Sequence, residues 1–474
     1  MNRLIQLKNT TPLILLALVC FSLLPTAQAL TPAPDGGYPG ASTAEGDNAL
    51  FNLTIGIADT AVGFDALHDN TTGSWNVGIG ASALASNTTG QQNTAIGTEA
   101  LGANNASFNS ALGFRALLMN TTGFHLTAIG AAALRNNTVA SDNTAIGADA
   151  LRNNTRGPSN TAVGSSALSS NTVGNDNTAT GDSALSSNTN GFLNTATGSR
   201  ALMSNTGGGS NTATGDSALF SNTIGAQNTA TGHSALFSNT NGVANTATGL
   251  GALQSNTIGH DNTAVGEISL LNNTTGSDNV AFGHLAGHNA TTGSNNVYIG
   301  ANMQGVAAEN NACYIASIFG QTSADGIPVL INADNKLGTN TSSKRFKDSI
   351  KPMDKASEAI LALKPVTFRY KKEIDPKGAP QFGLVAEDVE KVTPDLVVRD
   401  KEGKPYSVRY DQVNAMLLNE FLKEHRKVEK LEATVAEQQR DFEAALAELK
   451  GQIQKVSAQL ELSRPAPQTV KNTD

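Results

Sequence analysis

A serine and a lysine five residues apart could form a nucleophilic pair in residues 341–350, which read TSSKRFKDSI in this 474-residue chain. A serine hydroxyl is a weak nucleophile that needs an adjacent base, and a lysine amine acts as that base only when it is neutral. Desolvation or nearby cations lower the pKa of a lysine toward that state. The spacing therefore indicates a built-in cleavage site. An isolated pair of this kind is more often two surface residues, so the flanking sequence has to decide.

The elements that carry such a pair limit how it can work. Residues at positions i and i+5 point to different faces of a helix and to opposite faces of a strand. A serine and a lysine at this spacing cannot meet within one regular element, and they need a bend or a neighbouring subunit. This requirement predicts a safety mechanism in which only the assembled protein is competent to cut.

Two regions of different composition meet at this stretch. Residues 342–474 hold 24 of the 32 basic and 22 of the 40 acidic side chains, a net charge of +2. Residues 30–341 hold 6 basic and 18 acidic side chains, a net charge of −12. An acidic region lacks the positively charged surface that binds nucleic acid, so we expect no nucleic-acid partner.

The first residues predict export. Arg3 and Lys8 precede an apolar run over residues 13–24 and an Ala-Gln-Ala cleavage site that ends at Ala29, the pattern of a secretory signal peptide over residues 1–29. The apolar run is short for a bilayer-spanning helix. We therefore expect a secreted or cell-surface protein without a membrane-spanning anchor.

Residues 47–303, after a linker expected over residues 30–46, repeat with the consensus Asn-Thr-Ala-x-Gly-x-x-Ala-Leu-x-x-Asn-Thr-x-Gly. One glycine of each unit marks the register, and every step is 17 residues except the 16-residue step from Gly97 to Gly113. The register glycines are Gly63, Gly80, Gly97, Gly113, Gly130, Gly147, Gly164, Gly181, Gly198, Gly215, Gly232, Gly249, Gly266, Gly283 and Gly300. This period is too short for a helical repeat and predicts a parallel β-solenoid with two or three short strands per coil.

The fixed positions of the repeat predict how a coil is built. Alanine and leucine should stack inside, and asparagine and threonine should form hydrogen-bonded ladders at the turns. A coil this thin buries little, which favours several chains packing their solenoids together, and we expect three. Steps such as Ala95-Ile96-Gly97 resemble the head repeats of trimeric autotransporter adhesins, which also implies a trimer.

No catalytic constellation is expected in the repeats. Glycoside cleavage needs two carboxylates at a defined separation, whereas residues such as Asp59, Asp149 and Asp182 stand singly, and we expect surface or turn roles for them. This disfavours a depolymerase rod that acts on polysaccharide. His284 and His288 share a ligand-like spacing but lie in a Gly-rich coil, so we expect no metal and no cofactor.

Beyond the repeats, residues 304–341 predict a β-rich neck in which Cys313 is a buried small hydrophobe, with an interchain disulfide as the alternative. Residues 355–363 predict a helix, and a last helix is predicted over residues 413–462. Its second half carries apolar residues at alternating spacings of four and three, a heptad seam that predicts a coiled coil. These residues are Phe442, Leu446, Leu449, Ile453, Val456 and Leu460. We expect residues 463–474 to form a disordered tail.

Four ordered motifs lie in the C-terminal region. They read Ser342-x-x-Arg345-Phe346-Lys347-x-x-Ile350, Leu363-Lys364-Pro365-Val366-x-Phe368-x-Tyr370, Gly383-Leu384-Val385-Ala386-Glu387-Asp388-Val389 and Val408-x-Tyr410. Over residues 342–440 this series resembles the peptidase S74 domain, the intramolecular chaperone at the C-terminus of phage endosialidases and other tail spikes.

The resemblance implies a domain that trimerises a β-rich rod ahead of it and then cuts itself off through a Ser-Lys pair. By position it implies Ser342 as the nucleophile, Lys347 as the general base, and a cut between Thr341 and Ser342. Two positions depart from the family pattern: Ser343 stands where the family usually has Asp, and Phe346 where Leu is common.

The sequence as a whole predicts a mainly β chain with a trimeric β-solenoid stalk, a small α+β S74-type domain and a C-terminal coiled coil. The expected function is that of an exported trimeric fibre or adhesin-like protein that releases its own assembly domain. Its expected partners are two further copies of itself and a cell-surface glycan or protein. The alternative is a non-cleaving structural fibre in which the S74-like domain only trimerises.

Overall fold

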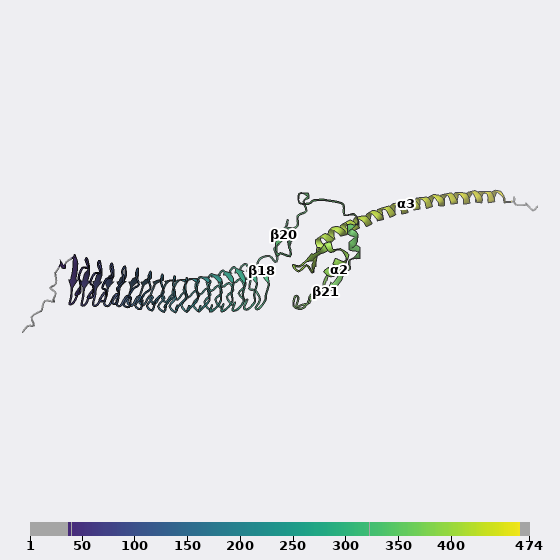
Figure 1. Cartoon of the computed structure of the whole chain (residues 1–474). Coiled ribbons are helices and arrows are strands. Elements are labelled where there is room, and N and C mark those ends of the chain that lie inside the picture. Colours follow the sequence, from purple (N-terminus) through teal and green to yellow (C-terminus); the bar gives the residue numbers. More distant parts are fainter. Residues whose placement is uncertain (1–36, 39, 322, 465–474) are drawn as a thin grey trace, which may run out of the picture. The chain divides into compact units, whose positions relative to one another are not determined.

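The computed structural model describes residues 37–38, 40–321 and 323–464, which fall into two units (Figure 1). The unit up to Gln321 is a parallel β-solenoid, and the unit from Thr322 is a small domain with a long C-terminal helix. The predicted signal peptide and all but two residues of the predicted tail lie outside the described residues. Among the helices of the described ranges, none has both the length and the apolar character needed to cross a bilayer.

Each coil of the solenoid contributes one short strand to a single sheet. The strands are β1 (Gly37–Tyr38), β2 (Ser42–Glu45), β3 (Thr60–Val62), β4 (Val77–Ile79), β5 (Thr94–Ile96), β6 (Ser110–Leu112), β7 (Thr127–Ile129), β8 (Thr144–Ile146), β9 (Thr161–Val163), β10 (Thr178–Thr180), β11 (Thr195–Thr197), β12 (Thr212–Thr214), β13 (Thr229–Thr231), β14 (Thr246–Thr248), β15 (Thr263–Val265), β16 (Val280–Phe282), β17 (Val297–Ile299) and β18 (Cys313–Ile315). From β2 to β18 neighbouring strands pair in parallel, and β1 pairs antiparallel with β2. The expectation of a parallel β-solenoid is confirmed, but that of two or three strands per coil is wrong, because turns make up the rest of each coil.

Left-handed backbone at ordinary residues explains why turns replace further strands. Ser166 and Leu168 have φ angles of 56° and 53°, a conformation that costs a non-glycine residue about 1–2 kcal/mol. Their N–H groups thereby reach the neighbouring coils and donate to the carbonyl oxygens of Ala148 at 2.9 Å and Ala184 at 3.0 Å. The hydrogen bonds between coils offset the backbone strain, and the same pattern recurs along the rod.

The register glycines are required by the close approach of adjacent coils. Gly164 has a φ angle of 135°, and a Cβ atom on it would lie 2.4 Å from the carbonyl oxygen of Gly181. A side chain at this position would therefore clash with the backbone of the next coil.

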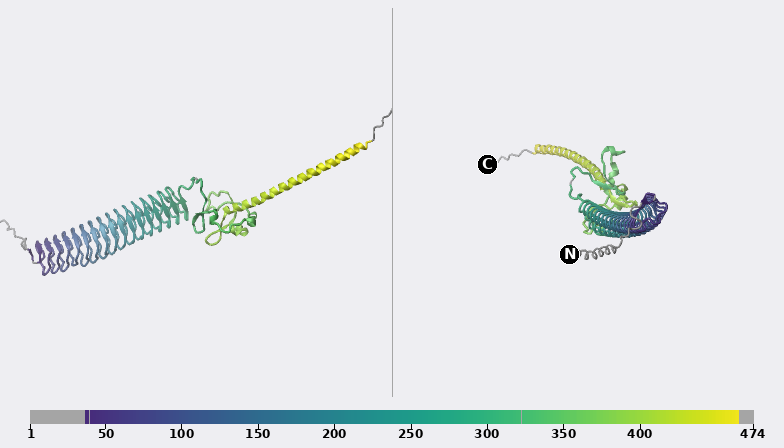
Figure 2. Two further views of the ribbon diagram at one scale, coloured as in Figure 1. Left: turned by 90° about the horizontal axis from the view of Figure 1, so that it is seen from above. Right: turned by 90° about the vertical axis from the view of Figure 1, so that its left-hand side faces the viewer.

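The interior of the coils is a stack of alanine and leucine. In one coil Ala162, Ala167 and Leu168 are fully buried, and their equivalents repeat along the rod, as expected from the sequence. This burial is complete within one chain, so the thin coil does not depend on other chains for its core. The stack of coils is visible in both views of Figure 2.

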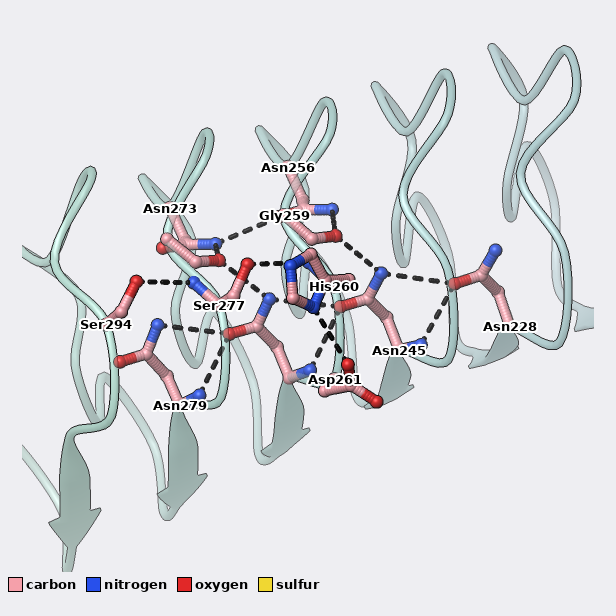
Figure 3. Close-up of polar contacts among 12 residues, drawn as sticks. Asn228, Asn245, Asn256, Gly259, His260, Asp261, Asn273, Ser277, Asn279 and Ser294 are labelled. Carbon is pink, nitrogen blue, oxygen red and sulfur yellow. Dashed lines mark hydrogen bonds and ion pairs between the residues drawn. The ribbon is translucent and has the colours of Figure 1, made fainter.

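Two ladders of buried asparagines run along the solenoid (Figure 3). In the first, an asparagine donates its backbone N–H and its Nδ2 to the Oδ1 of the asparagine one coil earlier, as Asn245 does to Asn228 at 3.0 and 3.1 Å. In the second only the side chain donates, as from Asn273 Nδ2 to Asn256 Oδ1 at 2.9 Å. Each Nδ2 also reaches a turn carbonyl, such as Gly259 O from Asn245 at 2.8 Å. The expected asparagine ladders are thus present, and they satisfy most of the side-chain polar groups that no solvent reaches. The exceptions in the ladders are Asn87 Oδ1 and Asn273 Oδ1, and Leu126 interrupts the first ladder.

The ends of the solenoid extend beyond the expected limits. Strand β2 lies within the expected linker, because residues 43–46 read Thr-Ala-Glu-Gly and keep the repeat pattern. Strand β18 lies within the expected neck and pairs with β17 in the same register as the other strands.

The second unit combines three antiparallel two-stranded sheets with helices. Strand β19 (Val329–Ile331) pairs with β20 (Leu337–Thr339), β21 (Val366–Phe368) with β22 (Gln381–Gly383), and β23 (Val397–Arg399) with β24 (Pro405–Val408). The helical elements are the 3-10 helices η1 (Lys344–Phe346), η2 (Asp354–Ala362) and η3 (Pro394–Leu396) and the α-helices α2 (Ala386–Val392) and α3 (Tyr410–Leu462). The helix expected over residues 355–363 is η2, and α3 begins three residues before its expected start.

Candidate functional site

Ser342 and Lys347 flank a short helical turn. Strand β20 ends at Thr339, and the chain continues without regular structure to Ser343, which has extended φ and ψ angles of −64° and 139°. Helix η1 follows, closed by a hydrogen bond from the N–H of Lys347 to Lys344 O at 3.1 Å. Ser342 and Lys347 thus lie on either side of a short turn and not within one regular element.

The bend does not bring the two side chains into contact. Residues 341–350 are all exposed, Phe346 to 59 % and Ile350 to 61 %. Among the hydrogen bonds of residues 323–464, none joins the Ser342 hydroxyl to the Lys347 amine. A single chain thus leaves both groups in water and apart from each other. The assignment of the pair stays a prediction, and it requires an environment that one chain does not provide.

One side-chain contact ties this segment to the rest of the unit. Asn340 donates from Nδ2 to Asp411 Oδ2 at 2.8 Å, and Asp411 lies in the first turn of α3. A carboxylate there is favourably placed toward the positive end of the helix dipole. On the other side of the predicted cut, the Arg345 guanidinium lies 4.6 Å from the centre of the Phe346 ring. The segment is therefore held beside the start of α3 at Asn340, while Ser342 and Lys347 have no such restraint.

A buried serine connects η2 to α3, a contact that sequence reasoning missed. The Ser357 side chain is fully buried, donates to the Glu420 carboxylate, and accepts from Asn419 Nδ2 at 2.7 Å. Lys423 Nζ lies 2.7 Å from Glu420 Oε1 and 3.3 Å from Glu358 Oε1. The Lys423 ammonium, followed by the Ser357 hydroxyl, lowers the pKa of Glu420 below its usual value. These residues lie more than sixty positions apart in sequence, so no local pattern could pair them.

Two of the sequence motifs meet at Gly383 and Tyr410. The Tyr410 hydroxyl accepts a hydrogen bond from the Leu384 N–H at 3.0 Å. A Cβ atom on Gly383 would lie 2.8 Å from the same hydroxyl. Glycine is therefore the residue that lets β22 approach the start of α3, and the two motifs form one contact.

The second unit leaves much of its apolar surface uncovered. An open hollow of about 470 Å³ lies between η2, β21, β22 and α3. Its lining is almost wholly apolar and includes Ile360, Leu363, Val366, Phe382, Leu384 and Leu417. Helix α3, 53 residues long, buries none of its residues. The buried apolar side chains of the described part of this unit are Ile360, Val389, Leu396, Val397 and Val408.

Asp59 occupies a different place from the one expected. It is fully buried, and among the described acidic residues no other is. Its Oδ1 accepts from the N–H and the Nδ2 of Asn76 at 2.8 and 3.1 Å, and its Oδ2 accepts from Asn70 Nδ2 at 3.1 Å. Burial raises the pKa of Asp59 above 3.8, and the bonds from Asn76 and Asn70 oppose this. The expected surface or turn role is wrong: Asp59 is the acceptor at which both asparagine ladders begin.

Cys313 and the histidine pair are the remaining candidates in the first unit. The expectation that Cys313 is buried is wrong, because it is the first residue of β18 and its side chain faces outward and is exposed. His284 and His288 form no ligand cluster: in the ranges that the structure describes, no three His, Cys, Asp or Glu side chains are grouped to hold a metal ion.

Comparison with known proteins concerns the second unit. No curated protein and no solved structure matches the chain. Residues 342–398 match the family model of peptidase S74, described as chaperone of endosialidase. The match begins at Ser342 and covers η1, η2, β21, β22, α2 and η3. The chain thus joins a parallel β-solenoid to a C-terminal segment that is similar to the peptidase S74 family of endosialidase chaperones.

Proposed function

We propose that this chain is an exported, trimeric fibre whose C-terminal unit drives assembly and then cuts the chain between Thr341 and Ser342. The rod displays a surface for adhesion to a cell-surface glycan or protein. Export follows from the signal peptide predicted over residues 1–29.

The observation that carries the proposal is the uncovered apolar surface of the second unit. The seam residues of α3 are between 39 % and 67 % exposed in one chain, namely Phe442, Leu446, Leu449, Ile453, Val456 and Leu460. A long helix gains most of its stability from packing an apolar face. A single α3 with its seam exposed to water lacks that packing. Heptad spacing is the pattern that a coiled coil buries. A trimer would bury the exposed seam of α3 in a three-stranded coiled coil and would cover the apolar hollow with neighbouring chains.

The proposed cut is an acyl transfer followed by hydrolysis. Lys347, neutral in the assembled protein, takes the proton of Ser342 Oγ, which attacks the carbonyl carbon of Thr341. The bond from that carbon to the Ser342 nitrogen breaks, and the nitrogen takes the proton from Lys347. An ester now joins Thr341 to Ser342 Oγ. Water hydrolyses it, leaving a carboxylate on Thr341 and restoring the hydroxyl.

Assembly controls the reaction in this scheme. In one chain both side chains are exposed and no hydrogen bond joins them, so the pair is not assembled for reaction. Packing of neighbouring chains around the segment would desolvate Lys347 and lower its pKa. The cut would then occur only after the trimer has formed.

A denaturing gel of the mature chain tests the proposal. The wild type should give two fragments, the shorter beginning at Ser342, whereas Ser342→Ala and Lys347→Ala should give one band. Ser343→Ala and Lys344→Ala are matched controls one and three residues away, and they should still be cut. A wild type that is trimeric but uncut would instead support the non-cleaving fibre.

A further inference from the structure

The outward face of the solenoid sheet has a polarity pattern that the fold of a coil does not require. The first and third residues of each strand point away from the core, because the middle residue points inward. From β3 to β18 the third residues form one row of sixteen along the rod, which we call the outer column. It reads Val62, Ile79, Ile96, Leu112, Ile129, Ile146, Val163, Thr180, Thr197, Thr214, Thr231, Thr248, Val265, Phe282, Ile299 and Ile315.

The outer column is apolar at both ends and polar in the middle. Seven aliphatic residues precede five threonines, and four apolar residues follow them. The apolar members are open to solvent in one chain: Ile129 is 40 % and Ile299 is 41 % exposed. Single exposed apolar residues are ordinary on a protein surface, whereas a continuous row of them marks a contact surface.

Over β3–β18 the same face carries no charge, and Glu45 of β2, which pairs with Val62, ends the row with a carboxylate. At the first and third positions of β3–β18, strands that the structure describes in full, no residue is Asp, Glu, Lys, Arg or His. The charged side chains of these coils lie elsewhere, for example Asp182, Arg200 and Asp216, which come one or two residues after a register glycine. Depletion of charge is what distinguishes the core of a protein interface from the rest of a surface.

We infer that the outer column is the seam along which the solenoids of identical chains pack, parallel to one another, and that its threonine block fixes their register. The inference rests on the proposed trimer and names the face that the trimer uses. A rotation axis parallel to the rod places each coil against the same coil of its partners. Apolar residues then meet apolar residues at both ends, and threonines meet threonines, which pair favourably across such a contact.

The threonine block removes an ambiguity that the repeat creates. The coils are so alike that sliding one rod by a coil would otherwise leave its contacts nearly unchanged. With the block, a slip of one coil places Val163 against Thr180 and Thr248 against Val265, so that a threonine hydroxyl loses water without gaining a partner. Antiparallel packing with the threonine blocks aligned leaves three residues of each seven-residue flank without an apolar partner, so parallel packing buries more of the column. A polar residue in an apolar seam fixes the register of coiled coils in the same way.

Single cysteines in the mature full-length chain test the seam. In a Cys313→Ser background, Ile129→Cys places a thiol on the outer column, and Val173→Cys places one at a turn residue of 41 % exposure. A short bismaleimide should join chains through Ile129→Cys and leave Val173→Cys chains single on a denaturing gel. The mass of each protein in solution is measured before cross-linking.

The outcomes separate this inference from the proposed trimer. A three-chain mass with cross-links through Ile129→Cys supports the seam. A three-chain mass without them overturns the seam and leaves the trimer standing, with the outer column free for another ligand. A single-chain mass overturns the proposed trimer itself.

Replacing the five threonines by isoleucine tests the register. Two tagged chains, one with Ile129→Cys and one with Ile146→Cys, are co-expressed and cross-linked, since these residues lie one coil apart. With the natural block, pairs between equal positions should outnumber pairs between unequal positions. With the isoleucine block, the fraction of unequal pairs should rise. An unchanged ratio would overturn the register role.

Discussion

Removal of one ladder asparagine should weaken the rod more than removal of its exposed neighbour. Asn205 is fully buried and donates from Nδ2 to Asn188 Oδ1 at 2.8 Å and to Gly208 O at 3.0 Å. It also accepts from Asn222 Nδ2 at 2.8 Å. Asn205→Ala deletes all three bonds, at about 1 kcal/mol each, and leaves Asn188 Oδ1 buried without a donor. We expect a loss of about 3 kcal/mol.

The matched control is Thr206→Ala, in the same turn. Thr206 is exposed and makes one side-chain bond, to Thr223 O at 3.1 Å. We expect this variant to lose less than about 1 kcal/mol, because water replaces the lost partner. Stability is measured by denaturant unfolding followed by circular dichroism, together with hydrogen exchange of the adjacent coils, since a repeat array unfolds through neighbouring units. Equal losses for Asn205→Ala and Thr206→Ala would refute the importance of the ladder.

Three further outcomes follow from other parts of the chain. Because burial raises the pKa of Asp59, its contribution to stability is greatest below pH 3.8 and is lost as the pH rises through the raised value. The free energy of opening of the first coils, obtained from hydrogen exchange after correction for the intrinsic exchange rate at each pH, should therefore fall from pH 4 to pH 7. Asp59→Asn should abolish that fall, and a pH-independent opening free energy in the wild type would contradict the reasoning. Tyr314→Phe should lower the free energy of chemical unfolding by about 1 kcal/mol, because it removes a hydroxyl that donates to Glu309 Oε2 at 2.6 Å. Tyr298→Phe is the control and should leave that free energy unchanged, because the buried Tyr298 hydroxyl bonds to no described residue. Gly383→Ala should displace the Tyr410 hydroxyl from the Leu384 N–H and reduce the yield of trimer, measured by mass in solution. Adding Tyr410→Phe should restore part of that yield, because it removes the clashing hydroxyl. A normal yield for Gly383→Ala would show that the contact is dispensable.

The period of the repeat was enough to predict the solenoid, its Ala and Leu interior and its asparagine ladders. The conformation of a coil was not predictable in the same way. Leu168 and its equivalents adopt left-handed backbone, which leucine disfavours on its own, and only hydrogen bonds to the next coil stabilise it. A reading of single-residue preferences therefore places strands where the chain makes turns.

In the second unit, too, some features were predictable from the sequence and others were not. Sequence motifs located the region that matches the S74 family, and the contact of Gly383 with Tyr410 explains two of them. The buried Ser357 and its partners on α3 were missed, because the pairing spans more than sixty residues. Cys313 was placed inside, whereas its strand position turns it outward. The Ser342–Lys347 pair remains a prediction, since its environment requires chains beyond one.

The asparagine ladders have a direction, since in the regular run a ladder Nδ2 donates toward the first coil and its Oδ1 accepts from the coil that follows. Leu126 interrupts the first ladder, and Asn87 Oδ1 has no donor in the second. The two ends therefore differ chemically, and the carboxylate of Asp59 meets the demand of the first end by accepting from both ladders. From Asn160 to Asn262 the pattern is unbroken, and each coil receives the same bonds that it passes on. Whole coils can then be inserted or deleted without breaking the pattern, and the reach of the fibre can lengthen or shorten in steps of one coil while its two termini keep their chemistry.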